Sequence, residues 1–153
     1  MIRKPVSEVY NAFVDPAVTT RFWFTRSDGA LSEGKNIRWS WDMYGVSATV
    51  HVNKMIANEL ISIRWGDPET TVDFEFRELA PDRTYVVIRN HGFKQEGSGL
   101  IALIKDNTAG FTSVLDGLKA WLEYGIELNL VLDKFPDKWN AGQQTLGEWQ
   151  KGR

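Results

Sequence analysis

TAGFTSVLDGLKAWLEYG, residues 108–125, is the stretch of this chain that decides its fold. Its large apolar residues recur at the i, i+3, i+4 and i+7 spacing that places side chains on one face of an α-helix. They are Phe111, Val114, Leu115, Leu118, Trp121, Leu122 and, just beyond the stretch, Ile126. Thr108 is a residue type that caps helix starts, and Gly125 is one that ends helices. The stretch predicts one helix of about 18 residues, roughly 27 Å long at 1.5 Å per residue.

The segments before this helix carry the patterns of β-strands. Alternation of apolar and polar residues, the two-residue period of a sheet with one buried face, appears in 36–42, 46–56, 60–65 and 70–77. Segment 83–90 is apolar on both sides in its middle, as in a strand that is covered on both faces. Turn-forming connectors of a few residues join these segments, and such short gaps favour antiparallel neighbours.

Three further segments have short helical patterns. Residues 5–14 place their apolar side chains on one side and begin close to Pro5. Asp15-Pro16 interrupts this helix, and a second short helix is predicted over 17–23. Residues 100–105 are expected to form one or two helical turns that lead into the long helix.

Composition restricts the classes of function. The chain of 153 residues is 42% hydrophobic and 25% charged, which is typical of one folded domain. It contains no cysteine, which excludes disulfides, thiolate zinc sites and a cysteine nucleophile. The net charge of −2 has interleaved signs, so we expect neither nucleic acid nor an anionic membrane as a partner. No segment has the length of a membrane span or the form of a signal peptide, so a cytoplasmic location is expected.

Several short motifs agree, in order and spacing over residues 2–126, with one known superfamily. The motifs are Ile2, Pro5, Val9, Tyr10 and Phe13; Asp15-Pro16 through Arg21-Phe22-Trp23; Glu59-Leu60 with Trp65; Thr84 with His91-Gly92-Phe93; and Gly110-Phe111, Val114-Leu115 and Leu118-Lys119. Together they resemble the START-like (helix-grip, SRPBCC) superfamily and, within it, the bacterial homologues of the activator of the heat-shock-protein-90 ATPase.

The resemblance implies an α+β helix-grip fold, in which a curved antiparallel β-sheet wraps around one long C-terminal α-helix. Two short helices lie near the N-terminus. The helix-grip domain is expected to span 1–136, followed by a polar C-terminal tail over 137–153.

Two positions depart from the family pattern. The family has a full strand before its first helix, whereas here only Met1-Ile2 could belong to one. Phe111 stands where tryptophan is common. A missing first strand would leave its neighbour as an exposed edge, which invites association. We therefore expect either a homodimer or a chain trimmed at its start.

The resemblance also implies a functional site, an apolar cavity between the long helix and the concave face of the sheet. The expected lining comprises Trp39, Trp41, Trp65, Phe74 and Phe76, with Trp23, Phe111 and Leu118 closing the cavity. Large aromatic side chains offer wide apolar surface to a ligand. The alternative interpretation is that these residues simply fill the core.

Other candidate chemistry has less support. His51 alternates with valines and is expected to face solvent, while His91 ends a strand and is either a turn residue or a group at the cavity mouth. Arg64, Glu75 and Arg77 are expected on a solvated outer face. Residues 97–102 form a partial G-x-G-x-x-A motif in the wrong context for a dinucleotide site. A nucleophile elbow, a zinc-protease motif and a P-loop are absent from the sequence, and we expect no metal and no cofactor.

Three functions remain. The first is non-catalytic binding of a small hydrophobic molecule in the cavity. The second is a co-chaperone-like module that binds a chaperone, which would present an exposed apolar patch instead of a deep cavity. The third is an enzyme that uses the cavity as its active site. It ranks below the others because the alternation places most charged residues outward, away from the cavity.

Overall fold

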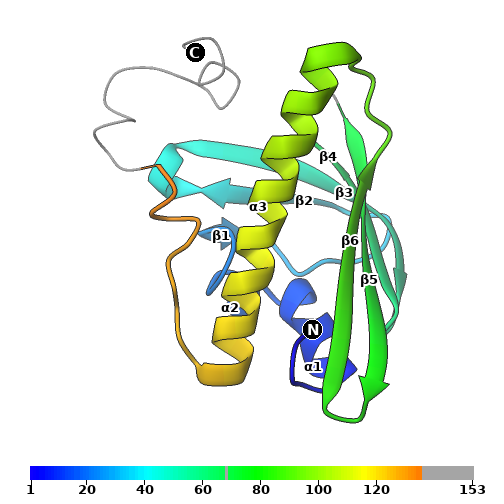
Figure 1. The fold of residues 1–153 in the computed structure, drawn as a ribbon, viewed down its shortest axis with the longest axis vertical. Coiled ribbons are helices and arrows are strands. Elements are labelled where there is room, and N and C mark those ends of the chain that lie inside the picture. Colours follow the sequence, from blue (N-terminus) through cyan, green and yellow to red (C-terminus); the bar gives the residue numbers. More distant parts are fainter. Residues whose placement is uncertain (68, 136–153) are drawn as a thin grey trace.

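The computed structural model describes residues 1–67 and 69–135, so the predicted tail over 137–153 lies outside the described residues. A curved antiparallel sheet wraps around one long helix, as Figure 1 shows. The strands are β1 (Arg26–Ser27), β2 (Asn36–Trp41), β3 (Val46–Ile56), β4 (Leu60–Trp65), β5 (Thr70–Ala80) and β6 (Arg83–His91), neighbours in this order. The helices are α1 (Val6–Val14), α2 (Pro16–Thr19), the 3-10 turn η1 (Asp42–Tyr44) and α3 (Gly97–Tyr124). The expected helix-grip fold is confirmed.

The strand predictions are confirmed with small changes at their ends. Asp42, predicted at the end of a strand, instead begins η1, and Gly45 closes this turn with a φ of 63° that favours glycine. The strand predicted over 70–77 continues to Ala80. The sequence analysis missed β1, which pairs with β2 through Arg26 and Ser27. A strand of two residues is too short to show an alternation of apolar and polar residues.

The predicted start of the long helix at Thr108 is wrong. Helix α3 begins at Gly97 and has 28 residues, so the turns predicted at 100–105 are part of it. Thr108 has helical neighbours on both sides, and its carbonyl accepts a hydrogen bond of 2.8 Å from the Thr112 hydroxyl. No proline separates the two predicted pieces, so the helix continues. It ends at Gly125, as predicted, with a φ of 66°.

The second predicted helix, over 17–23, is shorter than expected. Helix α2 starts at Pro16, where the Asp15 carboxylate accepts a hydrogen bond of 2.9 Å from the Ala17 N–H. It ends at Thr19 because Phe22, Trp23 and Phe24 are all buried. Three successive residues cannot all lie on one helix face, so the chain leaves the helix to bury them.

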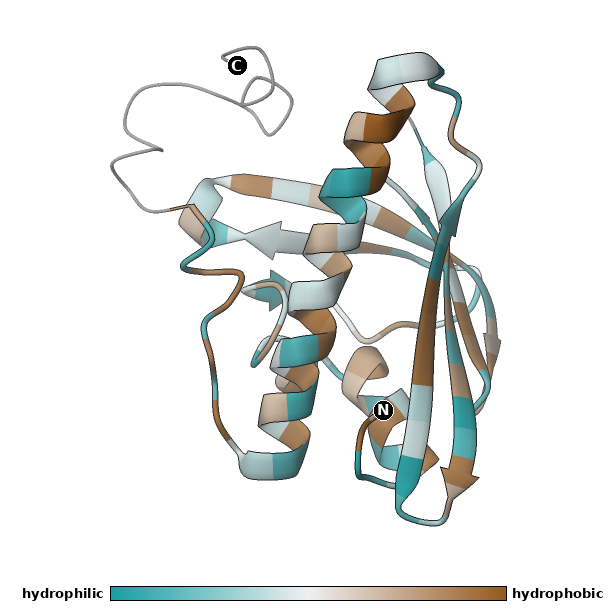
Figure 2. Cartoon of the chain, viewed as in Figure 1, coloured by the Kyte–Doolittle hydropathy of each residue, from teal (hydrophilic) through white to brown (hydrophobic). Residues whose placement is uncertain are grey.

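The core lies between the concave face of the sheet and the helices α1 and α3. Figure 2 shows hydrophobic and hydrophilic residues interspersed along α3 and the strands. The buried residues of α3 are Val114, Gly117 and Leu118, all in its C-terminal half. Gly117 lies so close to the turn after α2 that an added Cβ would be 3.1 Å from the Phe22 Cβ. Helix α3 is thus packed tightly against Phe22 at the position of Gly117. None of the described helices is long and apolar enough to cross a membrane.

The N-terminus joins β6 to the end of α3. Ile2 and Thr84 exchange two backbone hydrogen bonds, of 2.8 and 2.9 Å, at one end of β6. The next residue, Arg3, donates its N–H to the Glu123 carboxylate at 2.7 Å, and Lys119 pairs with the same carboxylate. The Glu123 side chain is only 5% exposed. These contacts anchor the first residues in the place of a longer first strand.

The two glycines within α3 should respond in opposite ways to alanine. Gly117→Ala is expected to lower the free energy of unfolding by about 1–3 kcal/mol, since the new methyl group overpacks against Phe22. Gly110→Ala is expected to raise it by about 0.5–1 kcal/mol, since a Cβ there meets nothing within 4 Å and alanine favours the helix. Urea unfolding of both variants measures the difference. Equal shifts would contradict the tight packing at Gly117.

The Glu123 contacts predict a pH-dependent contribution to stability. Burial acts to raise the pKa of the Glu123 carboxyl, but hydrogen bonds and charges from Lys119 and Arg3 outweigh it, and the pKa lies below its ordinary value of 4.5. A lowered pKa in the folded state stabilises the fold at neutral pH, and this contribution is lost as the pH falls through the folded-state value.

Glu123→Gln should therefore lower the free energy of unfolding at pH 7 by about 1–2 kcal/mol, and this difference should shrink as the pH is lowered toward about 3. Urea unfolding across this pH range provides the measurement. Glu8→Gln is the matched control, because Glu8 forms an exposed i,i+4 pair with Lys4 and should change stability little. A difference that stays constant with pH would contradict the assignment.

Candidate functional site

Most of the predicted site residues gather in one aromatic cluster. The Trp23 ring lies 4.8 Å from that of Trp39 and 5.8 Å from that of Phe74, between centroids. Phe111, on α3, lies 5.8 Å from Trp65. Trp41 joins the cluster through Trp65, at 6.4 Å, and Leu118 belongs to the same core. Phe76 lies apart from this group, against Tyr10 and Phe13 of α1.

The predicted residues differ in their exposure. Trp23, Trp39, Phe74, Phe76 and Leu118 are buried core residues, and Trp41, Trp65 and Phe111 are partly buried against the core. The rings of the set other than Phe76 pack against one another. Phe111 is the member of this set that borders the larger cavity described below, and Trp23 borders a smaller one.

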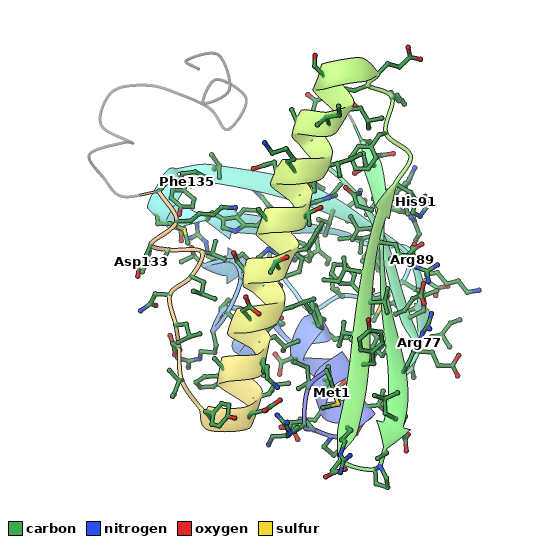
Figure 3. The ribbon with its side chains drawn as sticks, viewed as in Figure 1. Met1, Arg77, Arg89, His91, Asp133 and Phe135 are labelled. Carbon is green, nitrogen blue, oxygen red and sulfur yellow. The ribbon has the colours of Figure 1, made fainter. Side chains whose placement is uncertain are left out.

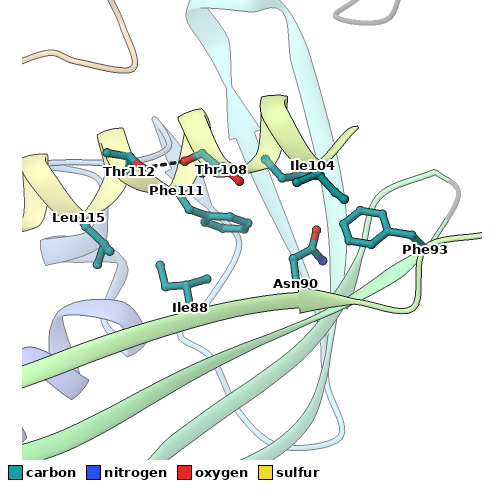
Figure 4. Close-up of a pocket in the computed structure, with 9 residues that line it drawn as sticks. Ile88, Asn90, Phe93, Ile104, Thr108, Phe111, Thr112 and Leu115 are labelled. Carbon is teal, nitrogen blue, oxygen red and sulfur yellow. Dashed lines mark hydrogen bonds between the residues drawn. The ribbon is translucent and has the colours of Figure 1, made fainter. Parts of the chain in front are cut away.

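A cavity of about 230 Å³ lies between the middle of α3, from Ile104 to Leu115, and the end of β6. Figure 4 shows α3 as one wall and β6 as the other. The lining residues are Ile88, Asn90, Phe93, Ile104, Asn107, Thr108, Phe111, Thr112 and Leu115. Those on α3 recur every three or four residues and share one face, and Ile88 and Asn90 are two apart on β6 and share the concave face. The cavity thus follows directly from helical and strand periodicity.

The sequence analysis missed eight of these nine residues. Ile104 and Asn107 precede the predicted helix start, so they could not be assigned to its inner face. The helical spacing of apolar residues continues from Leu115 and Phe111 back to Ile104, and this pattern could have placed Ile104 on the inner face of the helix. Ile88 and Asn90 lie on the strand that was expected to be covered on both faces. That expectation did not indicate which of its side chains point toward the helix.

One polar group in the cavity has a fixed orientation. The Asn90 Nδ2 donates to the Thr70 Oγ1 and to the Thr71 carbonyl, each at 2.9 Å. The Asn90 Oδ1 is buried and has no hydrogen-bond partner among the described residues. Figure 4 shows this oxygen on the side of Asn90 that faces α3. The cavity wall therefore contains one buried acceptor without a partner, beside the more exposed polar groups of Asn107, Thr108 and Thr112.

The lining contains no ionisable side chain. His91, which follows Asn90, is exposed, and its Nε2 lies 2.9 Å from the Asp73 Oδ2. His51 lies on another strand, with its Nδ1 2.7 Å from the Asn36 Oδ1. Burial raises the pKa of Tyr10, which is held in the core away from the cavity. Among the described residues, no three acidic or histidine side chains form a group that could hold a metal.

The outer face of β5 and β6 carries the charged residues. Glu75 pairs with Arg77 at 2.6 Å and with Arg89 at 3.0 Å. Figure 3 shows Arg77, Arg89 and His91 on the side of these strands opposite α3. The expected outer-face position of Glu75 and Arg77 agrees with these contacts. Acidic and basic partners are matched there, so the face has no strong net charge.

A second cavity, of about 160 Å³, lies under the chain that follows α3. Residues 127–132 form one wall, and the turn at 20–25 and Gly117 form the other. Arg21 ties the two walls together, with its Nη1 2.9 Å from the Glu127 Oε1 and its guanidinium over the Trp121 ring. The Tyr44 hydroxyl donates to the Val131 carbonyl. Burial raises the pKa of Tyr44, although a hydrogen bond from the Phe135 N–H acts to lower it.

Comparison with known proteins assigns the family. A family model described as Activator of Hsp90 ATPase homolog 1-like protein matches residues 3–123. The chain belongs to this family, which confirms the resemblance found in the sequence. No curated protein matches the chain.

Solved structures show the same fold. The crystal structure of SSP2350 from Staphylococcus saprophyticus is 25% identical, with a TM-score of 0.73 over 84% of this chain and 90% of that one. The solution structure of the Aha1 dimer from Colwellia psychrerythraea is 20% identical, with a TM-score of 0.66 over 81% of this chain and 92% of that one. The crystal structure of CalU16 from Micromonospora echinospora is 19% identical, with a TM-score of 0.62 over 91% of this chain and 81% of that one.

Proposed function

We propose that this member of the Activator of Hsp90 ATPase homolog 1-like family binds a small, mainly apolar molecule in the cavity between α3 and β6. The observation that carries the proposal is the cavity itself, about 230 Å³ in volume and walled largely by Ile88, Phe93, Ile104, Phe111 and Leu115. An apolar cavity of about 150 Å³ in another protein accommodates benzene, so this volume suits a molecule of one or two rings. It lies just below the range of about 300–1,000 Å³ for sites of drug-sized ligands.

The predicted aromatic cluster would form the inner end of this site. Phe111 borders the cavity and also contacts Trp65 and Trp23. A ligand against Phe111 would therefore lie near two indoles. Phe74, in contrast, is only 1% exposed, and its truncation would cost about 3–5 kcal/mol of stability. Residues at the cavity wall are consequently better tests of binding than residues of the core.

A non-catalytic role suits the chemistry of the lining. General acid–base catalysis needs a titratable group within hydrogen-bond reach of the reacting atoms. The polar groups among the nine lining side chains are hydroxyls and amides. The charged side chains of β5 and β6 pair with one another on the outer face. These observations support binding above the enzymatic alternative.

A matched pair of substitutions tests the proposed site. Ile104 lines the cavity and is 46% exposed, and Ile101, one turn earlier on α3, is 61% exposed and does not line it. Ile104→Trp places an indole across the cavity and should weaken binding of 1-methylnaphthalene at least tenfold, about 1.4 kcal/mol. Ile101→Trp should bind like the wild-type protein. Calorimetric titration measures both.

Equal affinities of the two variants would contradict the proposed site. An absence of binding to the wild-type protein would contradict the proposed function. That result would favour the protein-partner alternative, a chaperone-binding module, for which stimulation of a purified bacterial heat-shock-protein-90 ATPase is the assay.

We also propose that two copies of the chain pair along β6. On the side away from β5, β6 makes backbone hydrogen bonds within the described chain at Thr84 alone, to Ile2. Backbone groups along a strand alternate in direction, so those of Val86 and Ile88 point to the same open side as those of Thr84. An open edge of this kind pairs readily with another strand. The solved relative from Colwellia psychrerythraea is a dimer, which supports the proposal.

Light scattering should give twice the chain mass of 17.5 kDa at high protein concentration. Hydrogen exchange at the Val86 and Ile88 amides should slow as the concentration rises, because dimer formation would protect them. The Tyr85 and Val87 amides, which face β5, serve as internal controls and should change little. A monomer at every concentration would contradict pairing along β6.

A further inference from the structure

The Asn90 amide has only one orientation that its neighbours allow. The Thr71 carbonyl, 2.9 Å away, can only accept a hydrogen bond, so the group that faces it must be the NH₂ donor. Exchanging the amide nitrogen and oxygen would bring two acceptors together. The Thr70 hydroxyl accepts a second hydrogen bond from the same nitrogen, also at 2.9 Å. The Oδ1 is therefore held toward the cavity by two bonds on its opposite side.

This oxygen differs from the other polar groups of the lining. It is buried, whereas Thr108 and Thr112 are exposed and Asn107 is half-buried, so these three remain accessible to solvent. The Thr112 hydroxyl also donates to the carbonyl of its own helix at 2.8 Å. A buried carbonyl oxygen lowers its free energy when it accepts a hydrogen bond. Among the polar groups of the lining, Asn90 Oδ1 is thus the one that is both buried and without a partner.

The remaining lining restricts the charge of the occupant. No arginine, lysine or histidine faces the cavity to pair with an anion, and no carboxylate faces it to pair with a cation. Transferring an unpaired charge from water into such a site is strongly unfavourable. The apolar side chains of the lining and the one buried acceptor without a partner together suit a neutral ring that carries one donor.

We propose that the cavity selects neutral molecules with one hydroxyl or N–H group, such as phenols, indoles or small alcohols, and that this group donates a hydrogen bond to the Asn90 Oδ1. This inference rests on the proposed function, because it assigns the polar contact of the same site. It makes Asn90 the residue that determines specificity.

Three probes of similar size test the selectivity. 1-Naphthol and 1-methylnaphthalene have the same rings and differ in a hydroxyl against a methyl group, and 1-naphthoic acid is an anion at pH 7. Without an acceptor, the cost of burying the hydroxyl would favour 1-methylnaphthalene. We expect calorimetric titration of the wild-type protein to give at least tenfold tighter binding of 1-naphthol and no binding of 1-naphthoate.

Two variants assign the preference to Asn90. Asn90→Leu should lose the preference for 1-naphthol while still binding 1-methylnaphthalene. Ser113→Ala is the control, because it removes a hydroxyl group of α3 that bonds to the Ala109 carbonyl and does not line the cavity, and it should keep the preference. The comparison of probes on the wild-type protein needs no substitution, so it stands even if Asn90→Leu does not fold.

The outcomes separate this inference from the proposed function. If 1-methylnaphthalene binds as tightly as 1-naphthol or more tightly, the selectivity is overturned and the proposed function stands. If neither neutral probe binds, the proposed function fails and the selectivity fails with it. If 1-naphthol is preferred and a folded Asn90→Leu keeps that preference, the role of Asn90 is overturned.

Discussion

The close approach of α3 to the body at Gly117 is the constraint on which the rest of the structure depends. An added Cβ there would lie 3.1 Å from the Phe22 Cβ, so only glycine lets the helix come this near. The buried residues Val114 and Leu118 flank the same point. From there the N-terminal half of α3 runs past the end of β6, as Figure 1 shows. The cavity lies between β6 and the part of α3 from Ile104 to Leu115. The cavity thus begins at Leu115, two residues before the close approach at Gly117.

The chemistry of that space follows from two strand residues and one helix face. Ile88 and Asn90 point inward because they are two apart on β6, and Arg89 and His91 point outward to pair with Glu75 and Asp73. The alternation of one strand therefore removes charge from the cavity and leaves one amide in it. This separation is the basis for proposing that the cavity takes a neutral molecule.

Much of the fold could be predicted from the sequence, but most of the cavity could not. Alternation located the strands, and the apolar spacing of 108–125 located the C-terminal half of the helix, because both patterns record which side of an element is buried. The same patterns do not record the distance between the layers. Whether Trp39 and Phe74 fill a core or line an opening depends on that distance, and it is small at Gly117, where α3 approaches Phe22, a residue far away in the sequence.

The measurement that tests the central claim most directly is the set of NMR contacts between the protein and bound 1-naphthol. If 1-naphthol binds in the cavity between α3 and β6, nuclear Overhauser effects are expected from the naphthyl protons to the methyl groups of Ile88, Ile104 and Leu115. Contacts to Leu128 and Leu132 would instead place the molecule in the second cavity. That result would contradict the claim that the binding site lies between β6 and the part of α3 from Ile104 to Leu115.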